Sequence, residues 1–121
     1  MDLKFDNNIP IYIQLVEKLK IDIISGKIKP GERILSVREL ALLTKVNPNT
    51  MQKALVELEN LKLIYTERTN GKYVTDNQKL IDKYKKQYAD ELSNKFLSNM
   101  KNIGFNNEET INYLNNLKGD K

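Results

Sequence analysis

The spacing of apolar side chains along the first 60 residues predicts three short helices. Between Pro10 and Gly26, apolar residues recur every three or four positions with charged residues between them, which is typical of an amphipathic helix. A second helix is predicted from Ser36, which begins the Ser-x-x-Glu spacing of a capping box. A third is predicted after Asn47, an N-cap residue type followed by Pro48 at the first helical position.

Turn signals separate these helices and then give way to β-prone runs. Pro30-Gly31 predicts a type II turn between the first and second helices. Residues 63–66 and 72–75 flank Asn70-Gly71, and Asn-Gly between two β-prone runs is a strong signal for a hairpin.

The last third of the chain returns to a helical period. From Asn77, apolar residues recur every four positions as far as Met100, and Gly104 ends this long helix. Asn106 and Glu109 then form the capping box of a final helix.

Three helices followed by a hairpin within about 70 residues is the order of a winged helix-turn-helix. The predicted fold class is therefore mainly α with a small β-hairpin, in which a winged helix-turn-helix precedes a two-helix C-terminal dimerisation tail. We expect residues 1–76 to form a DNA-binding domain and residues 77–121 to form the helical dimerisation region.

The composition excludes several classes of catalytic and metal-binding site. The 121 residues include no Cys and no His, which excludes disulfides, thiolate metal sites and the most common general base. No apolar run reaches the roughly 18–20 residues needed to span a bilayer, and the N-terminus has no apolar h-region of a signal peptide. We expect a cytoplasmic binding protein that is not an enzyme and uses no metal, no cofactor and no membrane.

The formal net charge of +4 is too small to indicate nucleic acid by itself. Residues 1–76 carry twelve Lys and Arg against ten Asp and Glu, and residues 77–121 carry eight against six. Each part has a balance of +2, so any binding to a polyanion depends on where the individual cations lie.

The third helix and the hairpin tip have the chemistry of a DNA-binding surface. Residues 45–56 contain two Lys and no acidic side chain, and their amide side chains can pair with adenine in a major groove. The hairpin tip places two cations where they can meet the backbone or the adjacent minor groove. The candidate DNA-binding residues are Arg38, Lys45, Asn47, Asn49, Thr50, Gln52, Lys53, Arg68, Asn70, Gly71 and Lys72.

The apolar stripe of the long helix is too wide to be left in water, so it must pack on the rest of the chain or on a second subunit. Tyr84 and Tyr88 can also stack on a ligand, although packing is the usual role of such aromatics. The candidate dimer-interface residues are Leu80, Tyr84, Tyr88, Leu92, Phe96 and Met100.

Five motifs stand at a specific spacing over about residues 9–75: Pro10-Ile11-Tyr12, residues 26–33, residues 36–41, residues 47–51 and residues 54–59. Together they resemble the DNA-binding domain of GntR-family bacterial transcription regulators. The short tail, with one long and one short helix, is similar to the YtrA-like subfamily.

This resemblance implies a homodimer that binds double-stranded DNA at a pseudo-palindromic operator, with repression as the usual outcome and a transporter operon as the regulated unit. It leaves any small-molecule effector unidentified. The family commonly has Pro at Leu35, Gly at Lys45 and near Lys62, and Arg at Pro48 and Gln52. The third helix is the one that reads bases in the family that this chain resembles. Because it lacks those two arginines here, the family's recognition of guanine cannot be assigned to this chain. The alternative is a winged-helix protein-interaction module without specific DNA binding.

Overall fold

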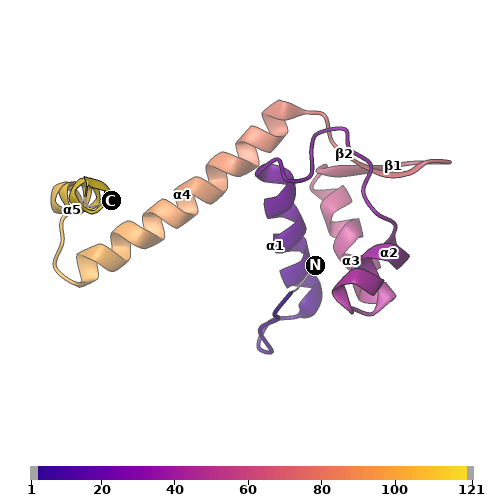
Figure 1. The fold of residues 1–121 in the computed structure, drawn as a ribbon, viewed down its shortest axis with the longest axis horizontal. Coiled ribbons are helices and arrows are strands. Elements are labelled where there is room, and N and C mark those ends of the chain that lie inside the picture. The colour runs from indigo at the N-terminus through magenta and orange to yellow at the C-terminus, as the bar shows by residue number, and fades with distance from the viewer. Residues whose placement is uncertain (1–2, 120–121) are drawn as a thin grey trace. The chain divides into compact units, whose positions relative to one another are not determined.

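A computed structural model describes residues 3–119 and contains five helices and one hairpin. The predicted order of three helices, a hairpin and two further helices is confirmed (Figure 1). The elements are α1 (Ile11–Ile24), α2 (Val37–Thr44), α3 (Pro48–Asn60), β1 (Ile64–Glu67), β2 (Gly71–Val74), α4 (Gln78–Asn102) and α5 (Asn107–Gly119).

The chain divides into two compact units, one ending at Tyr84 and the other beginning at Lys85. We call them the head and the tail. The predicted boundary at residue 76 lies eight residues earlier, at the end of the hairpin. The difference arises because the first turns of α4 pack on the head: Ile81 is 2% exposed, and the Tyr84 hydroxyl donates to the Leu61 carbonyl oxygen over 3.1 Å.

The core of the head is built from the apolar stripes of its helices and the inner side of its hairpin. Helices α1 and α3 lie side by side, with α2 packed against α3 (Figure 1). The buried apolar side chains are Leu15, Val16, Leu19, Ile23, Leu40, Ala41, Met51, Ala54, Leu55, Leu58, Leu63, Ile64, Val74 and Ile81. The 3.6-residue period of α1 and α3 thus fixes which faces are turned away from this core.

The chain between α1 and α2 runs along β2 of the hairpin. Pro30 and Gly31 form the predicted turn, in which Gly31 has φ +77° and the Glu32 N–H donates to the Lys29 carbonyl over 3.0 Å. Beyond the turn, the N–H of Ile34 donates to the hairpin at the Lys72 carbonyl over 2.9 Å. The bond from Ile34 joins the segment that precedes α2 to the hairpin.

The tail consists of most of α4 and all of α5. Gly104 ends α4 with φ +101°, as predicted. The predicted capping box of α5 is present: the Glu109 N–H donates to Asn106 Oδ1 over 2.8 Å, and the Asn106 N–H donates to Glu109 Oε1 over 3.1 Å. Large apolar side chains stay exposed on the tail, including Leu92, Phe96, Ile103, Ile111, Leu114 and Leu117.

Candidate nucleic-acid interface

The start of α2 is fixed by the capping box predicted at Ser36. The Glu39 N–H donates to Ser36 Oγ over 3.1 Å, and the Ser36 N–H donates to Glu39 Oε1 over 3.2 Å. These bonds to Ser36, with a smaller contribution from the charge of Arg33, lower the pKa of the Glu39 carboxyl. The box therefore leaves Arg38, one residue before Glu39, exposed in the first turn of the helix.

The turn between α2 and α3 depends on a left-handed residue. Lys45 has φ +57° and its N–H donates to the Ala41 carbonyl, as does the N–H of Val46 over 3.1 Å. This is a position at which the family pattern has Gly, and the backbone geometry explains the preference. Asn47 then caps α3, because its Oδ1 accepts from the Asn49 N–H over 2.8 Å. The turn thereby presents the first residues of α3 at the surface.

Helix α3 has one buried and one exposed face. Its core stripe consists of Met51, Ala54, Leu55 and Leu58. The opposite face carries the predicted DNA-contacting side chains, of which Asn49, Gln52 and Lys53 are exposed and Thr50 is half-buried. The structure therefore brings these four predicted residues together on one polar face.

Helix α1 contributes to the same surface. The Lys53 Nζ lies 3.9 Å from the centroid of the Tyr12 ring, and a shallow hollow here is lined by Tyr12 and Ile11 of α1 with Asn49, Thr50 and Lys53 of α3. Sequence reasoning assigned Tyr12 to the apolar stripe of the helix. Tyr12 is half-buried and packs against the core of the head, as that stripe predicts, while its ring also faces Lys53.

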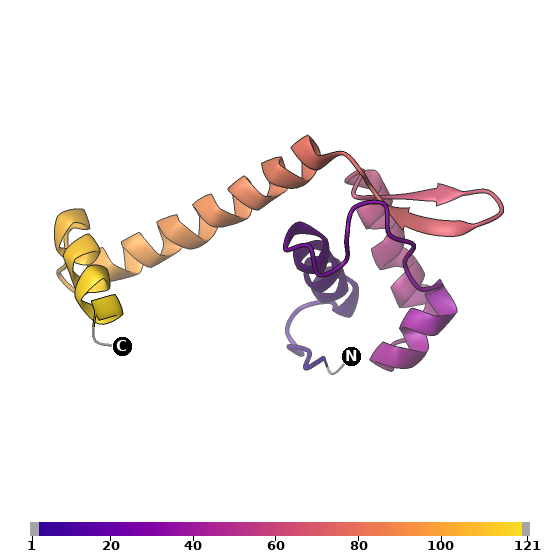
Figure 2. The same ribbon diagram turned by 45° about the horizontal axis from the view of Figure 1, so that its top comes forward.

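The hairpin forms the wing, and its tip projects away from the helices of the head (Figure 2). The hairpin prediction is confirmed, but Asn70-Gly71 does not form a two-residue turn. Gly71 pairs with Glu67 in the ladder, so the loop has three residues, 68–70. Gly71 has φ +98°, which a residue with a side chain rarely adopts. Arg68 and Asn70 are exposed at the tip, as predicted.

Lys72, the predicted wing cation, is already bonded to other residues of the head. Its Nζ contacts Glu59 Oε1 at the end of α3 and donates to Thr66 Oγ1 over 2.9 Å, while Thr66 donates to the same Glu59 oxygen over 2.7 Å. The hydrogen bond from Lys72 is the main reason that the pKa of the Glu59 carboxyl is lowered. Lys72 therefore joins the wing to α3 and has a compensated charge, unlike Arg68.

A groove separates the start of α2 from the wing, and we call it the wing groove. It is lined by Arg33, Ile34, Ser36, Val37, Arg38, Thr66, Glu67, Arg68, Thr69, Gly71 and Lys72. Two predicted cations, Arg38 and Arg68, thus lie on opposite walls of one groove. Arg33 lies there too, although sequence reasoning quoted it only as part of a motif. Its placement depends on the pairing of residues 31–34 with β2, which no local pattern reveals.

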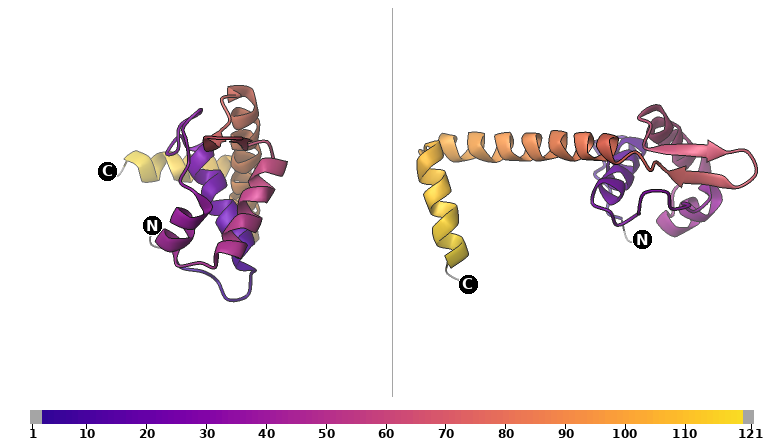
Figure 3. Two further views of the ribbon diagram at one scale, coloured as in Figure 1. Left: turned by 90° about the vertical axis from the view of Figure 1, so that its right-hand side faces the viewer. Right: turned by 90° about the horizontal axis from the view of Figure 1, so that it is seen from above.

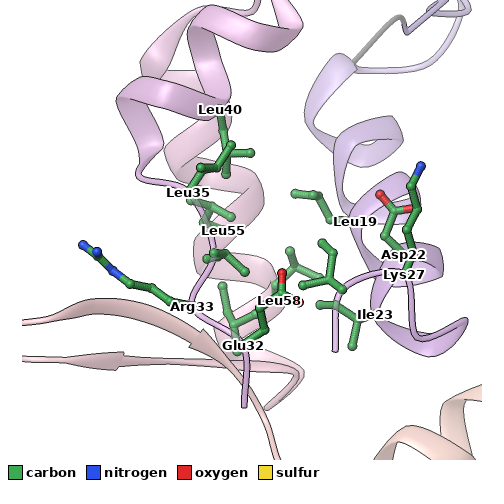
Figure 4. Close-up of a pocket in the computed structure, with 13 residues that line it drawn as sticks. Leu19, Asp22, Ile23, Lys27, Glu32, Arg33, Leu35, Leu40, Leu55 and Leu58 are labelled. Atoms are coloured by element: carbon green, nitrogen blue, oxygen red, sulfur yellow. The ribbon is translucent and has the colours of Figure 1, made fainter. Parts of the chain in front are cut away.

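A second hollow in the head is a feature of the core. It lies between α1, α3 and the segment that precedes α2, and Figure 4 shows Leu19, Ile23, Leu55 and Leu58 around it. Leu55 and Leu58 are at most 1% exposed, so the floor of this hollow is closed to water. The hollow therefore belongs mainly to the core, although Arg33 and Ile34 line both it and the wing groove.

The residues predicted for a dimer interface differ in their surroundings. Tyr84 packs on the core of the head, and Lys20 Nζ lies 4.8 Å from the centroid of its ring. Leu80, Tyr88 and Met100 are half-buried. Leu92 and Phe96 are 66% and 40% exposed. Over the described residues, no helix is both long enough and apolar enough to cross a membrane.

Comparisons with known proteins agree with this geometry. The model of the family described as bacterial regulatory proteins, gntR family, matches residues 11–74. The chain is 33% identical over 111 residues to the HTH-type transcriptional regulator YhcF of Bacillus subtilis, and the match covers 92% of each protein. It is 44% identical over 70 residues to the HTH-type transcriptional repressor YtrA of the same organism, covering 58% of this chain and 54% of YtrA.

Solved structures show the same fold. A GntR family transcriptional regulator from Listeria monocytogenes superimposes with a TM-score of 0.85 at 39% identity, covering 93% of this chain and 98% of that one. The DNA-binding domain of AraR in complex with its operator ORX1 superimposes with a TM-score of 0.57 at 28% identity, covering 62% of this chain and 95% of that one. The chain therefore belongs to the GntR family, a family of bacterial transcription regulators and not of enzymes, whose DNA-binding domain is the winged helix-turn-helix seen here.

Proposed function

We propose that the chain is a homodimeric repressor of the YtrA-like subfamily that binds a pseudo-palindromic operator. The observation that carries the proposal is the exposed polar face of α3 beside the wing groove. Asn49 and Gln52 are exposed there without a carboxylate among residues 45–56, so a phosphate backbone meets no repulsion on this face. AraR, whose DNA-binding domain has this fold, was solved on its operator.

In this proposal, α3 enters the major groove and its first two turns read the bases. Exposed Asn and Gln side chains at these positions suit bidentate pairing with adenine. Lys45, Asn47, Thr50 and Lys53 flank these amides and meet the backbone or adjacent bases. The wing loop, with Arg68 and Asn70, lies along the neighbouring minor groove, and Figure 3 shows the hairpin projecting beyond the helices of the head. Gly71 permits the loop conformation.

The homodimer is proposed from the apolar surface of the tail. Leu92, Ile103 and Ile111 are 66%, 70% and 57% exposed, which is a large cost for a single chain in water. A second copy of the tail would bury these side chains and place two heads about a two-fold axis. The interface that we propose comprises Leu80, Tyr88, Leu92, Phe96 and Met100, with Tyr84 connecting it to the head.

A regulator of this kind acts in the cytoplasm, where bacterial DNA lies, and we propose a transporter operon as its target from the resemblance to the YtrA-like subfamily. Selection of duplexes from a random pool with the full chain tests the function directly. The proposal expects a selected sequence with two inverted half-sites about one helical turn, or a multiple of it, apart. Selection of no sequence would favour the alternative, a protein-interaction module.

The dimer has its own test. Leu92→Asp places a charge within the proposed stripe, whereas Asn94→Asp places the same charge on the opposite side of the same helix turn. We expect Leu92→Asp to sediment as a monomer and Asn94→Asp to sediment as a dimer, like the parent chain. A dimer that survives Leu92→Asp would place the interface elsewhere.

A further inference from the structure

Arg33 is held in place by the wing but makes no hydrogen bond and no ion pair with its side chain anywhere in residues 3–119. The side chain lies against Gly71: a Cβ added at Gly71 would be 3.3 Å from both Nε and Nη2 of Arg33. Figure 4 shows the same side chain turned away from the core hollow and toward the hairpin. The guanidinium group is thus positioned with its hydrogen-bond donors unused.

The backbone near Arg33 is fixed from both sides. The N–H of Gly31 donates to the Val74 carbonyl over 3.0 Å, and the N–H of Val74 donates to the Glu32 carbonyl over 2.9 Å. Arg33 itself pairs with Tyr73 in an isolated antiparallel bridge. An arginine on such a support loses less conformational entropy on binding than one on a free loop.

The charges around Arg33 favour an anion. Arg33, Arg38 and Arg68 all line the wing groove, whereas Glu67 is the one carboxylate among its lining residues. Lys72 also lines the groove, but Glu59 compensates its charge. The charge of Arg33 helps to lower the pKa of the Glu39 carboxyl, but Glu39 Oε1 already accepts a hydrogen bond from the Ser36 N–H. Three guanidinium groups and one carboxylate leave the groove with an excess of positive charge, which favours a polyanion.

We propose that Arg33 binds a backbone phosphate of the operator in the wing groove, between the major groove that receives α3 and the minor groove beside the wing. This inference rests on the proposed function, because it needs duplex DNA as the partner. Guanidinium donors match two phosphate oxygens in a bidentate contact. Gly71 borders this site, since a Cβ there would lie 3.3 Å from Nε and Nη2 of Arg33 and would make the guanidinium shift by a few tenths of an ångström.

The test is fluorescence anisotropy with the full chain on the selected operator and on a scrambled duplex, over a series of salt concentrations. Arg33→Gln is expected to weaken binding to both duplexes by the same factor, about tenfold, and to reduce the salt slope by about 1. Lys29→Gln, which removes an exposed cation outside the groove, is expected to bind like the parent.

Gly71→Ala is a second test, which concerns the contact between Gly71 and Arg33. It is expected to weaken binding in the parent chain for two reasons: a Cβ strains the wing loop at φ +98°, and it shifts the guanidinium. The share due to the guanidinium is expected to disappear in the Arg33→Gln background, so the loss there is smaller than in the parent. Circular dichroism of each variant confirms that the head is folded. Losses that multiply in the double variant would overturn the role of Gly71 in the site.

Two results overturn the proposal for Arg33: binding and salt slope equal to those of the parent, or a loss on the operator alone, which would mean base reading. These results are distinct from failure of the proposed function, in which the parent chain binds both duplexes equally. In that case the change in salt slope caused by Arg33→Gln still reports whether the phosphate contact exists.

Discussion

Lys62 provides a test of the backbone geometry that connects α3 to the wing. Its φ is +65°, and it ends α3 in a Schellman motif. In this motif the Lys62 N–H donates to the Glu59 carbonyl over 2.9 Å. The Leu63 N–H donates to the Leu58 carbonyl over 3.1 Å. Gly is the usual residue at this position. We therefore predict that Lys62→Gly stabilises the protein.

The magnitude follows from two opposing terms. A residue with a Cβ pays about 1–2 kcal/mol for the left-handed conformation, and Gly loses about 0.5–1 kcal/mol more backbone entropy on folding. The centres of these ranges give a net gain of about 0.75 kcal/mol, which corresponds to roughly 3–6 °C in Tm for a unit the size of the head. The Lys62 side chain is exposed, so its loss contributes little.

Urea denaturation followed by circular dichroism, at one protein concentration, measures the change. Lys62→Ala is the matched control, because it removes the same charge but keeps the Cβ, and its midpoint is expected to equal that of the parent. Equal stabilisation by Ala and Gly would refute the reasoning, since the gain would then come from the lost charge. A Gly variant no more stable than the parent would refute it as well.

Three further predictions concern the interface. Lys45→Gly is expected to stabilise the head for the same backbone reason but to weaken operator binding, because it removes an exposed cation beside α3; thermal melts and anisotropy together separate the two effects. Glu59→Gln is expected to lower stability above pH 5 and to match the parent as the pH falls well below 4.5. The lowered pKa of Glu59 means that its contribution is present when the carboxyl is ionised and is lost as it protonates; urea midpoints across pH measure this. Gln52→Ala is expected to relax base preference by about 1–3 kcal/mol at one position of each half-site, and an unchanged preference in competition assays would remove Gln52 from the reading surface.

Much of the head was predictable because its signals are local. Ser36 and Glu39 lie three residues apart, and their bonds form within one turn of α2. The family pattern has Gly at Lys45 and near Lys62, and these two are the non-glycine residues with positive φ in the described chain. The structure explains this family preference, because Lys45 and Lys62 both have the left-handed backbone that Gly adopts most easily.

What the sequence could not predict depends on contacts between distant segments. Asn70-Gly71 indicates a hairpin, but residue types alone do not show whether Gly71 belongs to the loop or to the ladder. From the sequence, Lys72 was predicted to be a cation available to DNA. In the structure its charge is paired with Glu59 of α3, which lies thirteen residues earlier in the chain. The stripe of α4 does not show that Tyr84 faces the head, because an apolar position looks the same whichever partner covers it.

The central claim is that the polar face of α3 and the wing groove recognise a specific DNA sequence. Anisotropy titration of the full chain against the selected operator and a scrambled duplex, at two salt concentrations, tests it most directly. The account predicts binding to the operator at least about 1,000-fold tighter than to the scrambled duplex near physiological salt. Equal, steeply salt-dependent binding to both duplexes would contradict it.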